Sequence, residues 1–406
     1  MKLSNIIKEA AAKRLSVVET DPSSSHQHEI NGVAGLKRLF GEDKARLRAN
    51  IYFLGDDSFE RETCALTWYD ARESHLTRSE YRLYYSAEFE IEKRLHPGDL
   101  LIVARTVKSG PILLIAKMGS VAERQLIWLF GIPTDLKQSF VIIPETQINS
   151  EIGSVARGIL EDLGIEPKTD RDEAGLDQIK ARFGEAFPTS IEFSDFTREF
   201  MGATIDSVAT PDATISMLLR EEERLFRIFE KHLVESKIRS SIIDNDNSDV
   251  DHFVSLAQSV VQRRKARAGR AFENHLEYIF KENKIRYTRN GHTENKAKPD
   301  FIFPGEQYYQ NKHFEAQYLT ILGAKTTCKD RWRQVLTEGT RVTTKHLVTL
   351  EAGISENQTD EMQAQKLQLI VPEEVFGVYT PQQQGWLWKI KDLITMLRDK
   401  EKFLAN

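Results

Sequence analysis

Cysteine is nearly absent from this chain, which has only Cys64 and Cys328 among its 406 residues. A single pair of cysteines cannot staple a chain of this length, and no Cys or His spacing resembles that of a zinc site. These absences exclude a disulfide scaffold and a structural zinc domain, and they fit a reducing compartment.

Long apolar runs are also lacking, since no stretch approaches the roughly 18 residues that a membrane span needs. Residues 1–18 carry an acid and several bases, unlike a secretory signal peptide. The net charge of -5 argues against a general nucleic-acid coat protein, although a local basic face is enough for a specific binder. We therefore expect a globular cytoplasmic protein without a membrane segment.

The chain is long enough for two domains, each with its own core. In the first half, short β-rich runs such as "RANIYFLGDD", "EYRLYYSAEFEI" and "DLLIVARTV" are separated by turn residues. Several short strands at close spacing predict a small barrel or pseudobarrel. The polar stretch "IEPKTDRDEAG" is the best linker candidate. The predicted division is a first domain at 1–170, a linker at 171–180 and a second domain at 181–406.

The second half has a different periodicity. Long segments with apolar residues at helical spacing, such as "ATISMLLREEERLFRIFEKHLVES" and "PQQQGWLWKIKDLITMLRDKEKFL", alternate with the strand-like runs "DFIFP", "YLTILGAK", "HLVTLEAG" and "LQLIVP". Helices surrounding a few mixed strands predict an α/β domain.

Acidic residues and a lysine stand at the ends of two of these strand-like runs. Asp300 follows Pro299 at the start of one, and Lys325 ends the next. Glu338 lies 13 residues beyond the lysine, on a helix that "DRWRQVLTEG" begins, and Glu273 lies upstream in another helical segment. Phosphodiester hydrolysis needs a hard cation with oxygen ligands, and a lysine can stabilise the charged transition state. By spacing alone, solvated strand ends explain the pattern better.

The residues next to this lysine are suited to reading bases. Lys329, Asp330 and Arg331 follow at the expected start of a helix. Arginine or lysine recognises guanine and aspartate accepts from the cytosine amino group, so this cluster could read G·C pairs in the major groove. The alternative is a helix start with a capping aspartate and solvated bases.

The stretch "AKTTCKDRWRQVLTE" resembles the active-site block of the EcoRII restriction endonucleases, a branch of the PD-(D/E)XK nuclease superfamily that cuts CC(A/T)GG-type sites. "KPDFIFP", "VDHFVSLAQSVVQRRKARAGRAFENHLEYIF" and "FPTS" agree with it in order. The resemblance implies a Mg-dependent site with Glu273, Asp300, Lys325 and Glu338 as catalytic residues, its three carboxylates as metal ligands. It also implies that Lys329, Asp330 and Arg331 read C·G pairs.

Family members flip the central bases of their site into a side-chain pocket, which needs a stacking face. The resemblance makes Arg220 and Arg224 the candidates for this pocket. The alternative is a helix face laced with ion pairs to the neighbouring glutamates.

The run "VVQRRKARAGR" contains five basic residues and no acid. It leads directly into Glu273, so we expect a helix that contacts DNA phosphates. The candidates are Arg263, Arg264, Lys265 and Arg267. A solvated helix face is the alternative.

Two pieces of the first half, "SSSHQHEINGVAGLKRLFG" and "SHLTRSEYRLYY", resemble the pseudobarrel that precedes the nuclease in this family and is similar to the plant B-three DNA-binding domain. The resemblance places His26, Arg78, Glu80 and Arg82 on DNA-contact positions. Tyr81 departs from it, because a lysine is expected there.

These observations predict a type II restriction endonuclease that acts as a homodimer on double-stranded DNA, since a palindromic site mirrors two-fold protein symmetry. The first domain is expected to bind a second copy of the site and to inhibit the nuclease until it does. A cognate DNA methyltransferase that protects host DNA is implied. The alternatives are a catalytically silent DNA-binding regulator, and a repair nuclease or nickase.

Overall fold

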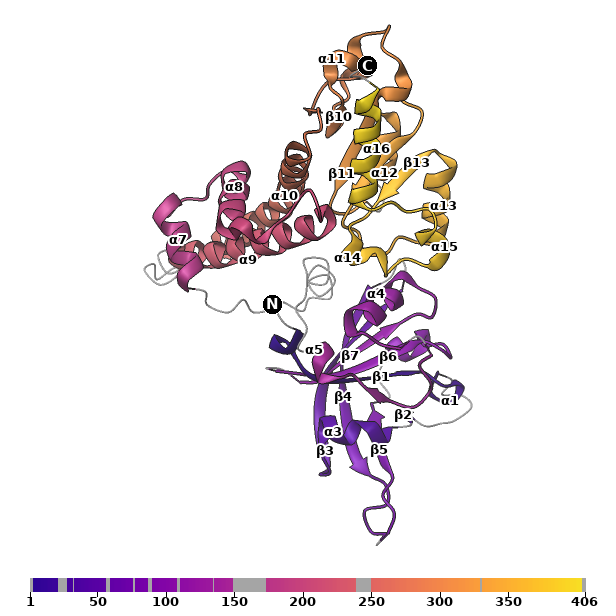
Figure 1. Cartoon of the computed structure of the whole chain (residues 1–406). Helices are drawn as coiled ribbons and strands as arrows, with labels where there is room; N and C mark the ends of the chain where they lie inside the picture. Colours follow the sequence, from indigo (N-terminus) through magenta and orange to yellow (C-terminus); the bar gives the residue numbers. More distant parts are fainter. Residues whose placement is uncertain are drawn as a thin grey trace. The chain divides into compact units, whose positions relative to one another are not determined.

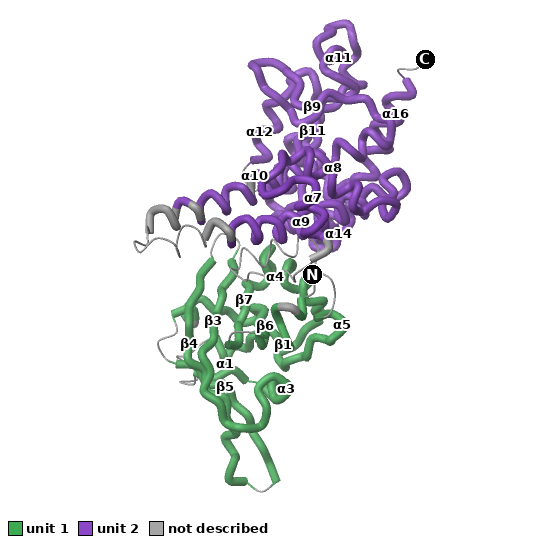
Figure 2. Tube along the Cα trace, turned by 90° about the vertical axis from the view of Figure 1, so that its left-hand side faces the viewer, with its two compact units in different colours: residues 1–152, 156–168 green, residues 153–155, 169–406 purple. Residues whose placement is uncertain are grey.

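The chain divides into two compact units in a computed structural model that describes residues 3–20, 28–31, 33–55, 59–75, 77–86, 90–107, 110–133, 135–148, 173–238, 250–328 and 331–403. The first unit comprises residues 1–152 and 156–168, and the second comprises residues 153–155 and 169–406 (Figure 2). Residues 171–172 of the predicted linker lie outside the described residues, whereas residues 173–180 lie in the helix Glu173–Phe183, where Ile179 is fully buried. This part of the predicted linker is therefore a packed helix, and where the linker begins stays a prediction. Within the described ranges, no helix is both long and apolar enough to cross a membrane.

The first unit is built on one eight-stranded sheet (Figure 1). Its order is β2-β5-β4-β3-β7-β6-β1-β8, and every neighbouring pair is antiparallel except β3 and β7. The strands are β1 (Ile7–Arg14), β2 (Glu29–Ile30), β3 (Ala45–Leu54), β4 (Phe59–Asp70), β5 (Tyr81–Tyr85), β6 (Leu100–Thr106), β7 (Ile112–Ala116) and β8 (Val141–Ile142). The helical segments are η1 (Leu3–Asn5), α1 (Val17–Thr20), η2 (Val33–Leu36), α3 (Lys37–Phe40), η3 (Glu90–Arg94), α4 (Val121–Phe130) and α5 (Glu145–Ile148).

This sheet buries both of its faces. Along β6, Leu100 and Ile102 pack into one hydrophobic cluster, while Leu101 and Val103 pack into another, because successive strand residues point to opposite faces. Helix α4 covers the first cluster, and η2 covers the second. Since η2 contacts both β5 and β8, which lie near opposite edges of the sheet, the sheet curls around the second cluster. The β-rich first half predicted from the sequence is confirmed.

The second unit combines a helical lobe with a five-stranded sheet of order β13-β12-β11-β10-β9. Strands β11, β12 and β13 are parallel, and β9 and β10 are antiparallel to their neighbours. The strands are β9 (Thr288–Arg289), β10 (Phe301–Phe303), β11 (Thr320–Lys325), β12 (Lys345–Thr349) and β13 (Leu367–Ile370). The four predicted strands are present as β10 to β13, which confirms the α/β architecture.

The helices of this unit lie around the sheet and in a separate lobe (Figure 1). The lobe contains α7 (Glu173–Phe183), α8 (Ser190–Met201), η4 (Gly202–Thr204), α9 (Pro211–Ile238) and most of α10 (Val250–Glu282). The remaining helical segments are η6 (Glu294–Lys296), α11 (Glu306–Gln310), η7 (Ala316–Tyr318), α12 (Trp332–Thr337), α13 (Glu356–Ala364), α14 (Glu373–Phe376), α15 (Pro381–Gln384) and α16 (Ile390–Lys402).

Helices α10 and α16 cover one face of the five-stranded sheet. Phe272 and Phe280 of α10 pack with Phe301 and Phe303 of β10 in a single buried cluster that also contains the apolar stripe of α16. The opposite face of β10 packs Ile302 into a second cluster near α11. Because both faces are covered, the strands are held rigidly and their ends can position side chains.

Helix α12 approaches β11 very closely at Gly323. A Cβ atom at this position would lie 2.7 Å from Cγ2 of Val335, whose side chain is fully buried in α12. Only glycine allows this approach without a shift of the helix. The position of α12 relative to the sheet therefore depends on the lack of a side chain at Gly323.

The substitution Gly323→Ala should destabilise the protein by roughly 1–3 kcal/mol, because the added methyl group overpacks a well-filled contact. The expected result is a lower Tm for the second unit in differential scanning calorimetry of the full chain. Gly269→Ala is the matched control, since a Cβ at this helical glycine meets nothing within 4 Å and alanine favours helix. A Tm of Gly323→Ala equal to that of the wild type would contradict the close contact.

Candidate active site

Asp300 and Lys325 meet at one edge of the five-stranded sheet. Asp300 immediately precedes β10 and Lys325 is the last residue of β11, and since these strands are antiparallel the two positions lie at the same end. Oδ2 of Asp300 accepts hydrogen bonds from Nζ of Lys325 and from the backbone N–H of Ala324, each at 2.7 Å. The side chains are only 12% and 23% exposed, so this ion pair is weakly screened by solvent.

Glu338 lies beside this pair. It is the first residue after α12, with extended backbone, whereas the sequence predicted it within the helix. Burial and then the negative charge of Asp300 raise the pKa of Glu338 to about 7, and the positive charge of Lys325 opposes them. Its Oε2 is buried and has no hydrogen-bond partner among the described residues. The structure therefore groups Asp300, Lys325 and Glu338, three of the four predicted catalytic residues.

Glu273, the fourth, is held by a different partner. Its Oε2 accepts a hydrogen bond at 2.9 Å from Arg289 of β9. In the part of the chain that the structure describes, no three His, Cys, Asp or Glu side chains cluster as a metal site. The carboxylates that the structure brings together are thus those of Asp300 and Glu338, while the charge of Glu273 is compensated by an arginine.

Sequence reasoning missed this arginine. Arg289 donates to three acceptors on α10, namely Glu273, Oδ1 of Asn274 at 2.8 Å and Glu277 at 2.9 Å. It stands opposite Phe301 in the sheet register, one position from Asp300. A single arginine in a two-residue strand forms no sequence pattern. Only the strand register of the folded sheet shows that Arg289 connects α10 to the sheet edge at which Asp300 lies.

Of the predicted base-reading residues, the structure describes only Arg331. Lys329 and Asp330 lie outside the described residues. Arg331 is exposed at the start of α12, and its backbone N–H donates to the carbonyl of Cys328 at 2.9 Å. A role in base recognition stays a prediction for all three.

Arg220 and Arg224, the candidates for a flipped-base pocket, make ion pairs on α9. Arg220 lies 3.7 Å from Glu374, and Nε of Arg224 donates to Glu221 at 3.0 Å. The guanidinium of Arg224 also lies 5.9 Å from the ring of Phe200. The Arg224 contact matches the alternative of a helix face paired with its neighbouring glutamates, whereas the partner of Arg220 lies on α14; the pocket stays a prediction.

The basic residues of α10 differ in their exposure to solvent. Arg267 is only 9% exposed, donates to the carbonyl of Pro188 at 3.1 Å and lies 4.6 Å from the rings of Phe193 and Phe226. Burial lowers the pKa of this arginine. The expectation of a phosphate contact is wrong for Arg267, because α10 packs this face against α8 and α9.

Its neighbours are also engaged within the lobe. Nε of Arg264 donates to the buried Glu230 of α9 at 2.6 Å, but the Arg264 side chain is still 31% exposed, so its contact with DNA phosphates stays a prediction. The guanidinium of Arg263 lies 4.3 Å from the ring of Phe187. The side chain of Lys265 lies outside the described residues.

In the first unit, the predicted DNA contacts fall into three groups. His26 lies outside the described residues, and Arg78 is exposed between β4 and β5. Arg82 is paired with Glu29 at 2.7 Å and with Glu80 at 2.9 Å. The hydrogen bond from Arg82 is the main cause of a lowered pKa of Glu80. Both residues therefore belong to a charge network that joins β2 to β5, and their contact with DNA stays a prediction.

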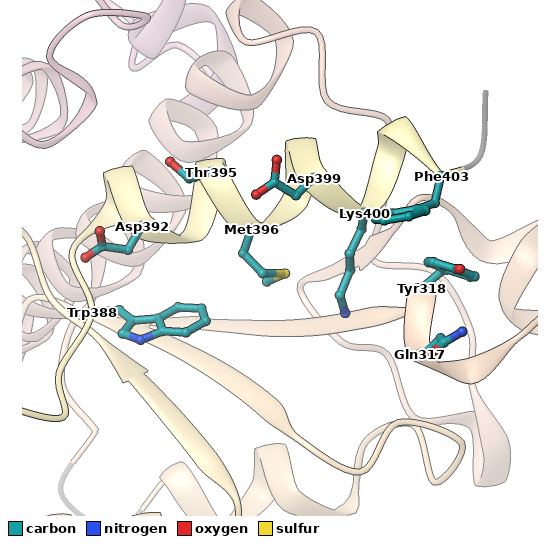
Figure 3. Close-up of a pocket in the computed structure, with 9 residues that line it drawn as sticks. All are labelled: Gln317, Tyr318, Trp388, Asp392, Thr395, Met396, Asp399, Lys400 and Phe403. Atoms are coloured by element: carbon teal, nitrogen blue, oxygen red, sulfur yellow. The ribbon is translucent and has the colours of Figure 1, made fainter. Parts of the chain in front are cut away.

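A groove of about 420 Å³ lies elsewhere on the second unit, along α16 and η7 (Figure 3). Its apolar lining comes from Trp388, Met396, Tyr318 and Phe403, with Asp392 and Asp399 at its rim. None of the predicted site residues lines it. The candidate active site is therefore defined by the grouping of charged side chains at the sheet edge and not by this groove.

Two of the structural comparisons are with restriction endonucleases bound to DNA. The structure entitled "Metal-depleted Ecl18kI in complex with uncleaved DNA" is 22% identical, covers 58% of this chain and 86% of its own, and has a TM-score of 0.47. The "Restriction endonuclease PspGI-substrate DNA complex" is 17% identical, covers 53% of this chain and 93% of its own, and has a TM-score of 0.42.

Sequence comparisons point to the segment that carries the site. The chain is 39% identical over 170 residues to the type II restriction enzyme EcoRII of Escherichia coli. This match spans 42% of the chain and 41% of the length of that enzyme. The family model described as "EcoRII C terminal" matches residues 226–394, a range that contains Glu273, Asp300, Lys325 and Glu338. Residues 226–394 of this chain are therefore similar to the EcoRII C-terminal family, and the chain spans less than half of the length of the enzyme that it matches.

Proposed function

We propose that this protein is a type II restriction endonuclease that hydrolyses phosphodiester bonds at a specific site in double-stranded DNA, with Mg²⁺ as its cofactor. The observation that carries the proposal is the grouping of Asp300, Lys325 and Glu338 at one sheet edge within the segment that matches the EcoRII C-terminal family. Two carboxylates can hold a metal ion that assists phosphodiester hydrolysis, and a lysine can stabilise the charge that develops on the phosphate.

The donor set suits Mg²⁺. Mg²⁺ is commonly held by one or two carboxylates, with water and phosphate oxygens as its other ligands. Oε2 of Glu338 is buried and lacks a partner among the described residues, which is costly for a carboxylate unless a cation or a proton compensates it. Asp300 and Glu338 would hold the ion. When bound, it would polarise the phosphate and lower the pKa of an attacking water.

Lys325 supplies the positive charge of the site. Its ammonium group now pairs with Asp300, and three N–H donors allow it to bond a further acceptor without leaving that carboxylate. A phosphate oxygen that gains charge during hydrolysis is such an acceptor. Glu273 would contribute indirectly, through its hydrogen bond with Arg289, which lies next to Asp300 in the sheet register.

The resemblance to EcoRII suggests the substrate and the assembly. We propose a CC(A/T)GG-type site read by Lys329, Asp330 and Arg331, and a homodimer in which each subunit cuts one strand. The first unit would act as an effector domain with a pseudobarrel fold that binds a second copy of the site and inhibits cleavage in its absence. A cognate methyltransferase would protect host DNA without binding this chain.

Asp300→Asn should abolish site-specific cleavage, because the amide cannot replace a carboxylate ligand or balance Lys325. We expect a rate loss beyond the roughly 10- to 100-fold that follows loss of a group behind a metal ligand. The measurement is linearisation of plasmids with and without CC(A/T)GG in the presence of Mg²⁺. Asp360→Asn, on the exposed surface of α13, is the control and should cut like the wild type.

Two outcomes of the plasmid assay would count against the proposal. Breaks that do not depend on the site would favour a repair nuclease or nickase. Specific binding without cleavage by the wild type would favour a catalytically silent regulator.

Cleavage should also depend on the protonation of Glu338. Its pKa of about 7 means that the side chain is neutral below this pH and ionised above it, and only the ionised form binds a cation well. The single-turnover rate at subsaturating Mg²⁺ should therefore fall by up to about tenfold per unit as the pH decreases below about 7. Because Mg²⁺ competes with the proton, more Mg²⁺ should move the midpoint to lower pH. A flat rate from about pH 5.5 to 8.5 would contradict this role.

Removal of the first unit should speed cleavage if that unit inhibits the nuclease. A fragment that begins at Glu173, the first residue of α7, retains the described elements of the second unit. It should cut a DNA that carries a single site faster than the full chain does. Equal rates for the two proteins would argue against inhibition by the first unit.

A further inference from the structure

The chain turns sharply just after Glu338, and a half-buried carboxylate and a buried hydroxyl group bind the backbone of this turn. The backbone N–H of Thr340 donates to Oε2 of Glu294 at 3.2 Å. The backbone N–H of Arg341 donates to the hydroxyl of Tyr309 at 3.4 Å. Glu338 follows α12 directly and has no regular element on its other side. These two bonds hold the chain where it leaves the candidate ligand, together with the backbone bond from Val342 to Gly339 and the side-chain bonds of Arg341 to the carbonyls of Tyr309 and Phe314.

The first residue of the turn is pressed against the sheet. Gly339 has a φ of 68°, in the left-handed region that glycine adopts most readily. A Cβ atom here would lie 2.8 Å from Cγ1 of Ile321 in β11 and 3.4 Å from the hydroxyl of Tyr309. The turn therefore rests on β11 and on Tyr309 without intervening space.

Glu294 also belongs to the segment that leads into Asp300. Its carbonyl accepts from the backbone N–H of Ala297 at 3.1 Å, which closes a tight turn three residues before the aspartate. Within this turn Asn295 and Lys296 have φ values of 58° and 60°. A non-glycine pair in this region requires support from its surroundings. The backbone of Glu294 thus forms part of the turn that precedes Asp300, while its side chain binds the turn that follows Glu338.

Tyr309 completes the link. It is 3% exposed, and its hydroxyl lies 2.6 and 2.8 Å from the two carboxylate oxygens of Glu294. Burial would raise the pKa of Glu294, but hydrogen bonds, first that from Tyr309, outweigh burial and lower it. Burial, followed by the bond to Glu294, raises the pKa of Tyr309, so its hydroxyl remains a donor. The link is therefore a carboxylate bonded to a neutral phenol.

We propose that Glu294 and Tyr309 are positioning residues that set the separation of the Asp300 and Glu338 carboxylates. The inference rests on the proposed function of these carboxylates as metal ligands. The two ligands lie on different segments, one before β10 and one after α12, and Glu294 with Tyr309 is bonded to both segments. Groups behind metal ligands fix ligand orientation in this way, and their loss weakens metal binding.

The test uses Tyr309→Phe and Glu294→Gln in the full chain. Two quantities are measured, namely the Mg²⁺ concentration for half-maximal single-turnover cleavage and, without DNA, the Mg²⁺ concentration for half-maximal increase in Tm. Each variant should need about tenfold more Mg²⁺ in both measurements, with a cleavage rate at saturating Mg²⁺ within about threefold of the wild type. The double variant should be no worse than the more affected single one, because the two residues act as a unit.

Tyr308→Phe is the matched control. Tyr308 is adjacent in sequence, but its hydroxyl meets Arg286 at 3.5 Å instead of Glu294, so this variant should keep the Mg²⁺ dependence of the wild type. In a Glu338→Gln background, Tyr309→Phe should cause no further change in the Mg²⁺-dependent Tm.

The outcomes separate this inference from the proposed function. If Tyr309→Phe and Glu294→Gln lower the metal-free Tm but leave the Mg²⁺ dependence unchanged, the two residues are only structural and the inference is overturned. A wild type that gains no stability from Mg²⁺ would also overturn it. If the wild type gains stability from Mg²⁺ but does not cut DNA, the proposed function fails, and the Tm series still decides the role of Glu294 and Tyr309.

Discussion

The two hydrogen bonds that Oδ2 of Asp300 accepts, from Lys325 and from the backbone of Ala324, are the constraint on which the rest of the site depends. They join the start of β10 to the end of β11 and place an ammonium group beside a carboxylate at a mostly buried edge. Glu338 can approach this edge because the lysine partly offsets the repulsion between the two carboxylates. Without Lys325, burial and like charge would both act against bringing the second carboxylate close.

Burial of the Glu338 carboxylate is unfavourable, and contacts made by other residues hold it in place. Helix α12 lies close to β11 because Gly323 has no side chain, and this contact places the helix end next to Asp300. On the far side, Glu294 and Tyr309 hold the turn that follows. A carboxylate with a raised pKa is thus kept in place by groups that do not titrate near neutral pH, which is the arrangement expected of a preorganised ligand.

Some charged side chains of the second unit are used in packing its helices, and others lie at the candidate active site. Arg264 and Arg267 lie in a strongly basic stretch of α10, but Arg264 forms an ion pair with the buried Glu230 and Arg267 is buried against aromatic rings. Arg289, which has no such run around it, binds Glu273 next to the site. Guanidinium groups tolerate burial because they can stack on rings and bond several acceptors, so local density of arginine is a poor guide to exposure.

The sequence by itself determined the β-rich first half, the α/β second half and the strands that carry Asp300 and Lys325, because periodicity and turn residues are local properties. Together with a family resemblance it also identified Glu338, at a spacing that no local rule would select. The tertiary structure alone decided that Glu273 pairs with Arg289, that Arg264 pairs with Glu230 and Arg267 is buried, and that Glu294 and Tyr309 bind the turn after Glu338. These contacts join residues from 15 to 79 positions apart, and their formation depends on strand register and helix packing, which no local pattern in the chain encodes.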